Sequence, residues 1–145
     1  MSRALLLVAV LAVFGRPALA ELPPLSKAQL EDQASHIVTG RVVEVFSTER
    51  QKQSPEFVDT LYAIELDVAS AAKGDGIKPG QHLFVRTWKS SRRPRGWVGP
   101  GGQSVIPKPG NTVTVYLRNQ DGGYEILIPN GLSVDKAGSQ AESGQ

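Results

Sequence analysis

Basic side chains alternate with two tryptophans in one short stretch, residues 86–97. The basic residues are Arg86, Lys89, Arg92, Arg93 and Arg95, and the flanking aromatic residues, Trp88 and Trp97, are the only tryptophans in the chain. Guanidinium groups bind carboxylates and phosphates through paired hydrogen bonds, and indole rings stack on planar or cationic groups. We predict that this basic–aromatic run binds an acidic ligand or a protein partner. The alternative is a solvated charge run whose tryptophans close one end of the fold.

Catalytic and metal-binding chemistry has no comparable set of residues. His36 and His82 are the only imidazoles, and neither stands in a short metal-binding spacing. Glu65 and Asp67 share one face of a predicted strand, but that face is predicted to lie in water, where a carboxyl does not gain the raised pKa of a general acid. The chain contains no cysteine, which removes disulfides and thiolate metal sites. No catalytic residue, metal or cofactor is therefore expected.

The elements that must position the basic–aromatic run are mainly strands. Residues 57–69, FVDTLYAIELDVA, alternate most cleanly, with Tyr62, Ile64, Leu66 and Val68 on one face. Residues 35–46, SHIVTGRVVEVF, predict a strand in which Gly40 marks a bulge. The remaining predictions are a helix at 27–34 after the N-cap Ser26, an exposed loop at 47–56, strands at 81–88, 112–118 and 124–128, and a long irregular loop at 89–109.

The N-terminus predicts export. Residues 1–20 combine Arg3, an apolar run and a final Ala-Leu-Ala, the layout of a cleavable signal peptide, and the apolar run is too short to cross a membrane as a helix. Without Arg3 and Arg16 the remaining chain has equal numbers of basic and acidic residues, so a nucleic acid is not expected as a partner. We predict a periplasmic or secreted protein that keeps no stable membrane anchor.

A domain at 21–134 followed by a disordered tail at 135–145 completes the predicted organisation. Within this domain the segments ASHIVTGRVVEV, LYAIELDVASAAKGD, QHLFVRTW, PGNTVTVYLR and GGYEILI follow one another. Their order resembles the netrin-like OB-barrel superfamily, to which the tissue inhibitors of metalloproteinases belong, and is similar to uncharacterised bacterial exported proteins of that build. The resemblance implies a small five-stranded OB-like closed barrel with one short N-terminal helix; a β-sandwich is the alternative.

The resemblance does not imply protease inhibition, because the inhibitors chelate the protease zinc through an N-terminal cysteine and this chain has none. The preferred hypothesis is a non-enzymatic binding module of the bacterial envelope that engages its ligand or partner through the loop at 89–109. A second hypothesis is an accessory protein of assembly or maturation that contributes a sheet edge. A third, an enzyme of unfamiliar type, requires His36 or His82 to approach a carboxylate in space.

Overall fold

Five strands close on one another in a ring, within one six-stranded sheet. The computed structural model describes residues 22–136 and is mainly β with one short helix. The sheet order is β1-β2-β3-β5-β4-β6, and a further pairing of β1 with β4 completes the ring. The elements are α1 (Lys27–Gln33), β1 (His36–Gln51), β2 (Val58–Lys73), β3 (His82–Arg92), β4 (Thr112–Gln120), β5 (Gly123–Ile126) and β6 (Leu132–Val134).

The predicted fold class is confirmed: a mainly β fold with one short helix and five strands in a ring. There is one sheet, and not the two packed sheets of the alternative sandwich. The predicted signal peptide lies outside the described residues, as do residues 137–145 of the predicted tail. A short sixth strand, β6, follows β5 and was not predicted; it pairs with β4.

The core lies inside the ring and is built from alternate residues of each strand. Ile64, Leu66 and Val68 of β2 are at most 2 % exposed, which confirms the predicted inward face. The β4 side chains that were predicted to point inward are fully buried as well. Because successive strand residues face opposite ways, the residues that alternate with these buried side chains lie on the outer face of the sheet.

Gly40 bends β1 within the stretch where the strand pairs with both β2 and β4. The pairing of β1 with β2 shifts between Thr39 and Gly40, so the predicted irregularity is confirmed. A Cβ at Gly40 would lie 2.6 Å from the carbonyl oxygen of Asp67, so the two strands come too close for any side chain there. The bend lets one strand pair with β2 along its length and with β4 over residues 36–41.

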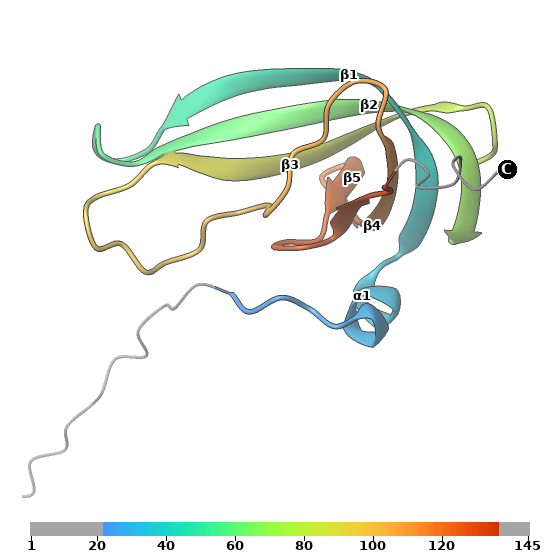
Figure 1. Ribbon diagram of the computed structural model, residues 1–145, viewed down its shortest axis with the longest axis horizontal. Coiled ribbons are helices and arrows are strands. Elements are labelled where there is room, and N and C mark those ends of the chain that lie inside the picture. The colour runs from blue at the N-terminus through green and yellow to red at the C-terminus, as the bar shows by residue number, and fades with distance from the viewer. Residues whose placement is uncertain (1–21, 137–145) are drawn as a thin grey trace, which may run out of the picture.

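The strands β1, β2 and β3 are longer than predicted and extend together beyond the ring (Figure 1). Residues 47–51, predicted as loop, continue β1 and pair with β2 as far as Val58. Residues 89–92, also predicted as loop, continue β3 against β2. Polar residues form these strand ends because cross-strand pairing, rather than burial, holds them. We refer to this three-stranded extension, residues 44–51, 58–65 and 86–92, as the arm.

Candidate functional site

The basic–aromatic run begins on the outer face of the arm. Arg86 and Trp88 alternate along β3 with the buried Val85 and Thr87 and therefore point outward. In the sheet register Trp88 is opposite Leu61, and Arg86 is opposite Ala63. The Arg86 guanidinium donates a hydrogen bond of 2.6 Å to the carbonyl oxygen of Gln120, which ties the β4–β5 hairpin to the arm.

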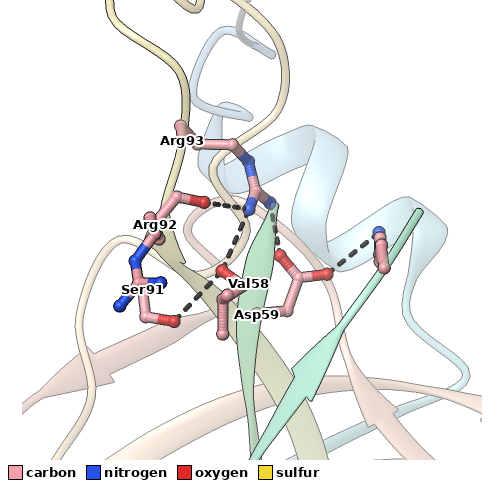
Figure 2. A network of polar contacts seen from close by, with 6 residues as sticks. Val58, Asp59, Ser91, Arg92 and Arg93 are labelled. Atoms are coloured by element: carbon pink, nitrogen blue, oxygen red, sulfur yellow. Dashed lines mark hydrogen bonds and ion pairs between the residues drawn. The ribbon is translucent and has the colours of Figure 1, made fainter. Parts of the chain in front are cut away.

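Asp59, on β2, is the fully buried centre of an ion-pair network at the tip of the arm. Its carboxylate pairs with the Arg93 guanidinium and, at 2.9 Å, with the Lys52 ammonium. Arg93 also donates to the carbonyl oxygens of Val58 and Arg92, at 3.0 and 2.8 Å. Figure 2 shows Arg93 pointing at both the carboxylate and the Val58 carbonyl. The network joins the β1–β2 turn to the segment that follows β3.

The same network sets the ionisation of Asp59. Burial alone would raise the pKa of this carboxyl, but the hydrogen bonds from Arg93 and Lys52, and their positive charges, outweigh burial and hold the pKa below its ordinary value. The carboxylate therefore stays ionised in the folded protein at pH values where the unfolded chain takes up a proton.

This lowered pKa predicts a specific loss of stability in acid. A carboxyl whose pKa is lower in the folded protein stabilises the fold above its unfolded pKa, about 4, and this contribution disappears as the pH falls through the folded pKa. The unfolding free energy of the wild type should therefore exceed that of Asp59→Asn by a constant amount above about pH 5, and the gap should narrow in more acidic solution. Urea titrations of both proteins from neutral to acid pH measure the gap; a gap that is constant over the whole range contradicts the assignment.

After β3 the chain turns back, and residues 101–104 lie along β3. Ser90 N–H donates to the Gly101 carbonyl at 2.9 Å, and Gln103 N–H donates to the Trp88 carbonyl at 2.8 Å. The Lys89 ammonium holds the same segment through the Ser104 carbonyl, at 3.1 Å. The long loop predicted from the sequence is thus shorter at its start, and it is fixed against the arm by backbone hydrogen bonds.

Two hollows meet at Trp88. The first, about 930 Å³, lies at the tip of the arm and is called the Trp97 hollow; the second, about 560 Å³, lies on the outer face and is called the Arg86 hollow. The Trp97 hollow is lined by Lys52, Gln53, Ser54, Phe57, Trp88, Arg93, Trp97 and Pro100. The Arg86 hollow is lined by Phe46, Ser47, Thr48, Arg50, Leu61, Tyr62, Ala63, Arg86, Thr87, Trp88, Gln120, Asp121 and Glu125.

Aromatic and cationic groups lie together in the Trp97 hollow. The Phe57 and Trp97 rings meet edge to face, with their centroids 5.1 Å apart. Lys52 lies 5.5 Å from the centroid of the Trp88 ring, and the Arg93 guanidinium lies 5.8 Å from that of Phe57. Such an arrangement offers ring faces for stacking beside positive charge for an anionic group.

The predicted site residues divide between binding surface and scaffold. Arg86, Trp88, Arg93 and Trp97 line one or both hollows. Lys89 and Arg92 contact backbone carbonyls, of Ser104 and Pro55 respectively, and line neither hollow. Arg95 is exposed and also lies outside both linings. The run predicted as a continuous site therefore supplies four side chains to it.

The β1–β2 hairpin supplies the residues that the sequence analysis missed. Lys52 and Phe57 stand at its turn and line the Trp97 hollow, and Phe46 and Arg50 extend the Arg86 hollow along β1. Phe46 is 52 % exposed, so its ring is accessible within the Arg86 hollow. Asp59 could have indicated these residues from the sequence. It is a charged residue among the apolar residues that begin a strand, and a buried carboxylate requires a cationic partner.

The two histidines have different surroundings. His36 is buried, donates through Nε2 to the Asp75 carbonyl at 2.8 Å, and meets the Tyr124 ring edge to face. His82 Nδ1 lies 2.9 Å from Glu65 Oε1, so one histidine does approach a carboxylate. That pair lies outside the linings of both hollows, and the His82 side chain is 56 % exposed.

Within residues 22–136, no three histidine, acidic or cysteine side chains gather as metal ligands. In the same range, no helix has the length and apolar character needed to cross a bilayer. Comparison with protein-family models, curated proteins and solved structures gave no significant match. The geometry of the two hollows is therefore the basis for proposing a function.

Proposed function

We propose that this protein is a non-enzymatic binding module of the bacterial envelope, periplasmic or secreted, that takes an acidic ligand along its two hollows. The observation that carries the proposal is the lining of the Trp97 hollow, which combines the rings of Phe57, Trp88 and Trp97 with the cationic groups of Lys52 and Arg93. The single carboxylate of Asp59 leaves this cationic pair with an excess of positive charge. An acidic polysaccharide combines rings that stack on aromatic side chains with carboxylates that pair with cations.

The position of the hollows supports the same proposal. OB-like folds bind oligosaccharides and oligonucleotides on the face of their second and third strands, between the β1–β2 and β4–β5 loops. Here the Arg86 hollow covers that face, from Phe46 on β1 to Asp121 in the β4–β5 turn. The netrin-like resemblance is part of this proposal and implies no activity of its own, because a fold of this kind hosts unrelated functions.

The two tryptophans make the proposal testable by fluorescence. Trp88 and Trp97 are the only tryptophans; both line the Trp97 hollow and Trp88 also lines the Arg86 hollow, so the tryptophan emission reports on the proposed binding surface. Titration with an acidic oligosaccharide such as oligogalacturonate should change the emission, and salt should weaken binding because exposed charges are screened. A neutral oligosaccharide of equal length should leave the emission unchanged.

Removal of one stacking ring should weaken binding without unfolding the protein. Trp97 is 44 % exposed, so Trp97→Ala should cost little stability, but it should reduce affinity for the acidic oligosaccharide about tenfold or more, the usual effect of losing one stacked ring. Val105→Ala is the matched control, since Val105 is 46 % exposed on the same segment and lines neither hollow. Titration calorimetry measures the affinity of both variants for the acidic oligosaccharide.

Equal affinities of the wild type and Trp97→Ala, or no binding of acidic oligosaccharides by the wild type, would contradict the proposed ligand. Capture from envelope extract then separates the remaining outcomes. A protein retained by the wild type and lost with Trp97→Ala would replace the polysaccharide with a protein partner at the same site. Arg93 is unsuitable for this test, since its removal breaks the buried pair with Asp59.

A further inference from the structure

One edge of the arm is open. β1 pairs with β4 only over residues 36–41, and the N–H and C=O groups of Val42 bond to Asn111 and Gly110. Beyond that point, no segment among residues 22–136 pairs with this side of β1, whereas β2 pairs with its other side as far as Gln51. In Figure 1 this free side of β1 is the outermost edge of the arm. We call residues 44–50 the open edge.

The backbone groups of the open edge that face away from β2 belong to alternate residues. The N–H of Val45 donates to the side chain of the preceding Glu44, at 3.1 Å, so it is directed away from the β1–β2 ladder. In a regular strand the next N–H groups with this direction are those of Ser47 and Glu49. Edge groups that face away from their own sheet are a template for another strand.

The sequence of the open edge is complementary to itself. If two copies pair antiparallel about a two-fold axis through Ser47, Glu44 of each copy lies opposite Arg50 of the other, and Phe46 lies opposite Thr48. An axis through Phe46 would instead place Glu44 opposite Thr48, and an axis through Thr48 would place Arg50 opposite Phe46. Only the axis at Ser47 forms two cross-strand ion pairs, and it also brings two outward N–H groups into register.

We propose that the open edge binds the open edge of a second copy of this chain, about a two-fold axis at Ser47. The resulting interface is isologous and joins two arms into one continuous six-stranded sheet. Phe46, Thr48 and Arg50 line the Arg86 hollow, so the two copies of that hollow become neighbours on one face of the joined sheet. The pairing depends on the edge alone and does not require that the proposed ligand be correct.

A single cysteine locates the axis, because the chain contains none of its own. At the Ser47 axis the two Ser47 Cα atoms lie about 5.5 Å apart, within the range that a disulfide bridges. Ser47→Cys should form a covalent dimer under mild oxidation at low protein concentration. Gln51→Cys, on the same edge, is the control: its two copies would be roughly 25 Å apart and should stay monomeric. Equal cross-linking of the two variants, or none with Ser47→Cys, overturns the proposal.

A charge exchange tests the register independently. Glu44→Arg and Arg50→Glu each place like charges opposite one another twice, and each should weaken dimerisation about tenfold or more. The double variant Glu44→Arg with Arg50→Glu restores opposite pairs and should recover the wild-type dimerisation constant. Sedimentation equilibrium of the purified proteins, at low and high salt, measures the constants. The proposal is overturned if the wild-type protein remains monomeric up to its solubility limit, or if the double variant dimerises no more tightly than the single variants. Capture of a different protein on this edge, in place of the second copy, also overturns it.

Discussion

Asp59→Asn is expected to lower the free energy of unfolding by about 3 kcal/mol, the usual cost of removing one member of a buried ion pair. Asp59 is fully buried, and its carboxylate is the counter-charge of both Arg93 and Lys52. The Arg93 side chain is only 13 % exposed, so the substitution leaves a nearly buried guanidinium without its anion. The neutral amide retains the shape of the carboxylate but supplies neither its charge nor its second acceptor oxygen.

Urea unfolding at neutral pH measures this loss, and Asp67→Asn is its matched control. Asp67 lies on the same strand and makes the same chemical change, but it is exposed, so its substitution should alter stability by no more than about 0.5 kcal/mol. A loss for Asp59→Asn as small as that of the control would mean that the network adds nothing to stability. In that case the tip of the arm would be held by the strand ladder alone.

The ring was accessible from the sequence because its strands have one buried face. The alternation of Ile64, Leu66 and Val68 is visible in the sequence, and burial of that face is what selects the register. The irregularity at Gly40 could be predicted for a related reason, since a glycine within a run of β-branched residues indicates that two backbones approach closely. Each of these signals arises from a contact with the core.

The ends of β1 and β3 in the arm were missed because they have no such face. In residues 47–51 every side chain is exposed, so the segment has the composition of a loop even though its backbone pairs with β2. The end of β3 was placed too early for the same reason, since Ser90, Ser91 and Arg92 carry no apolar signal. Cross-strand hydrogen bonds alone produce no hydrophobic periodicity in the sequence from which a strand could be predicted.

The binding surface was only half predictable. Arg86, Trp88 and Trp97 were identified from their types and spacing, and the structure brings them to the two hollows. Lys52 and Phe57 come from a hairpin whose position depends on the strand ends that were missed. The role of Arg93 as partner of Asp59 required a contact between residues 34 positions apart, which no local pattern contains.

The arm links the proposed binding surface to the proposed dimer. Its outer face carries the hollows, and its free edge carries the self-complementary sequence at Glu44 and Arg50. Residues 46–51 of β1 and 91–92 of β3 bury no side chain, so the stability of the arm's tip depends on the ladder, on the Asp59 network and on the segment that folds back over β3. The last of these contacts depends on one glycine.

Gly102→Ala is expected to lower the free energy of unfolding by about 3 kcal/mol or more. Gly102 has φ +81°, in the left-handed region, and an alanine Cβ there would lie 2.3 Å from the Trp88 carbonyl oxygen. That oxygen accepts the hydrogen bond from Gln103, so the segment cannot move away without losing the bond. The backbone conformation accounts for about 1–2 kcal/mol, and the collision with β3 for the remainder.

Gly110→Ala separates these two contributions. Gly110 has φ +90°, but a Cβ there would meet no atom within 4 Å, so its substitution carries the conformational cost without the collision. Urea unfolding of both variants should show a loss for Gly102→Ala at least about 1 kcal/mol larger than that for Gly110→Ala. Amide hydrogen exchange should also speed up at Ser90 and Gln103 in Gly102→Ala, because these N–H groups bond across the contact. Equal losses of unfolding free energy in the two variants, with unchanged amide exchange at Ser90 and Gln103, would contradict the contact between Gly102 and Trp88. The segment that holds Pro100 in the lining of the Trp97 hollow would then not be fixed against β3 by this contact.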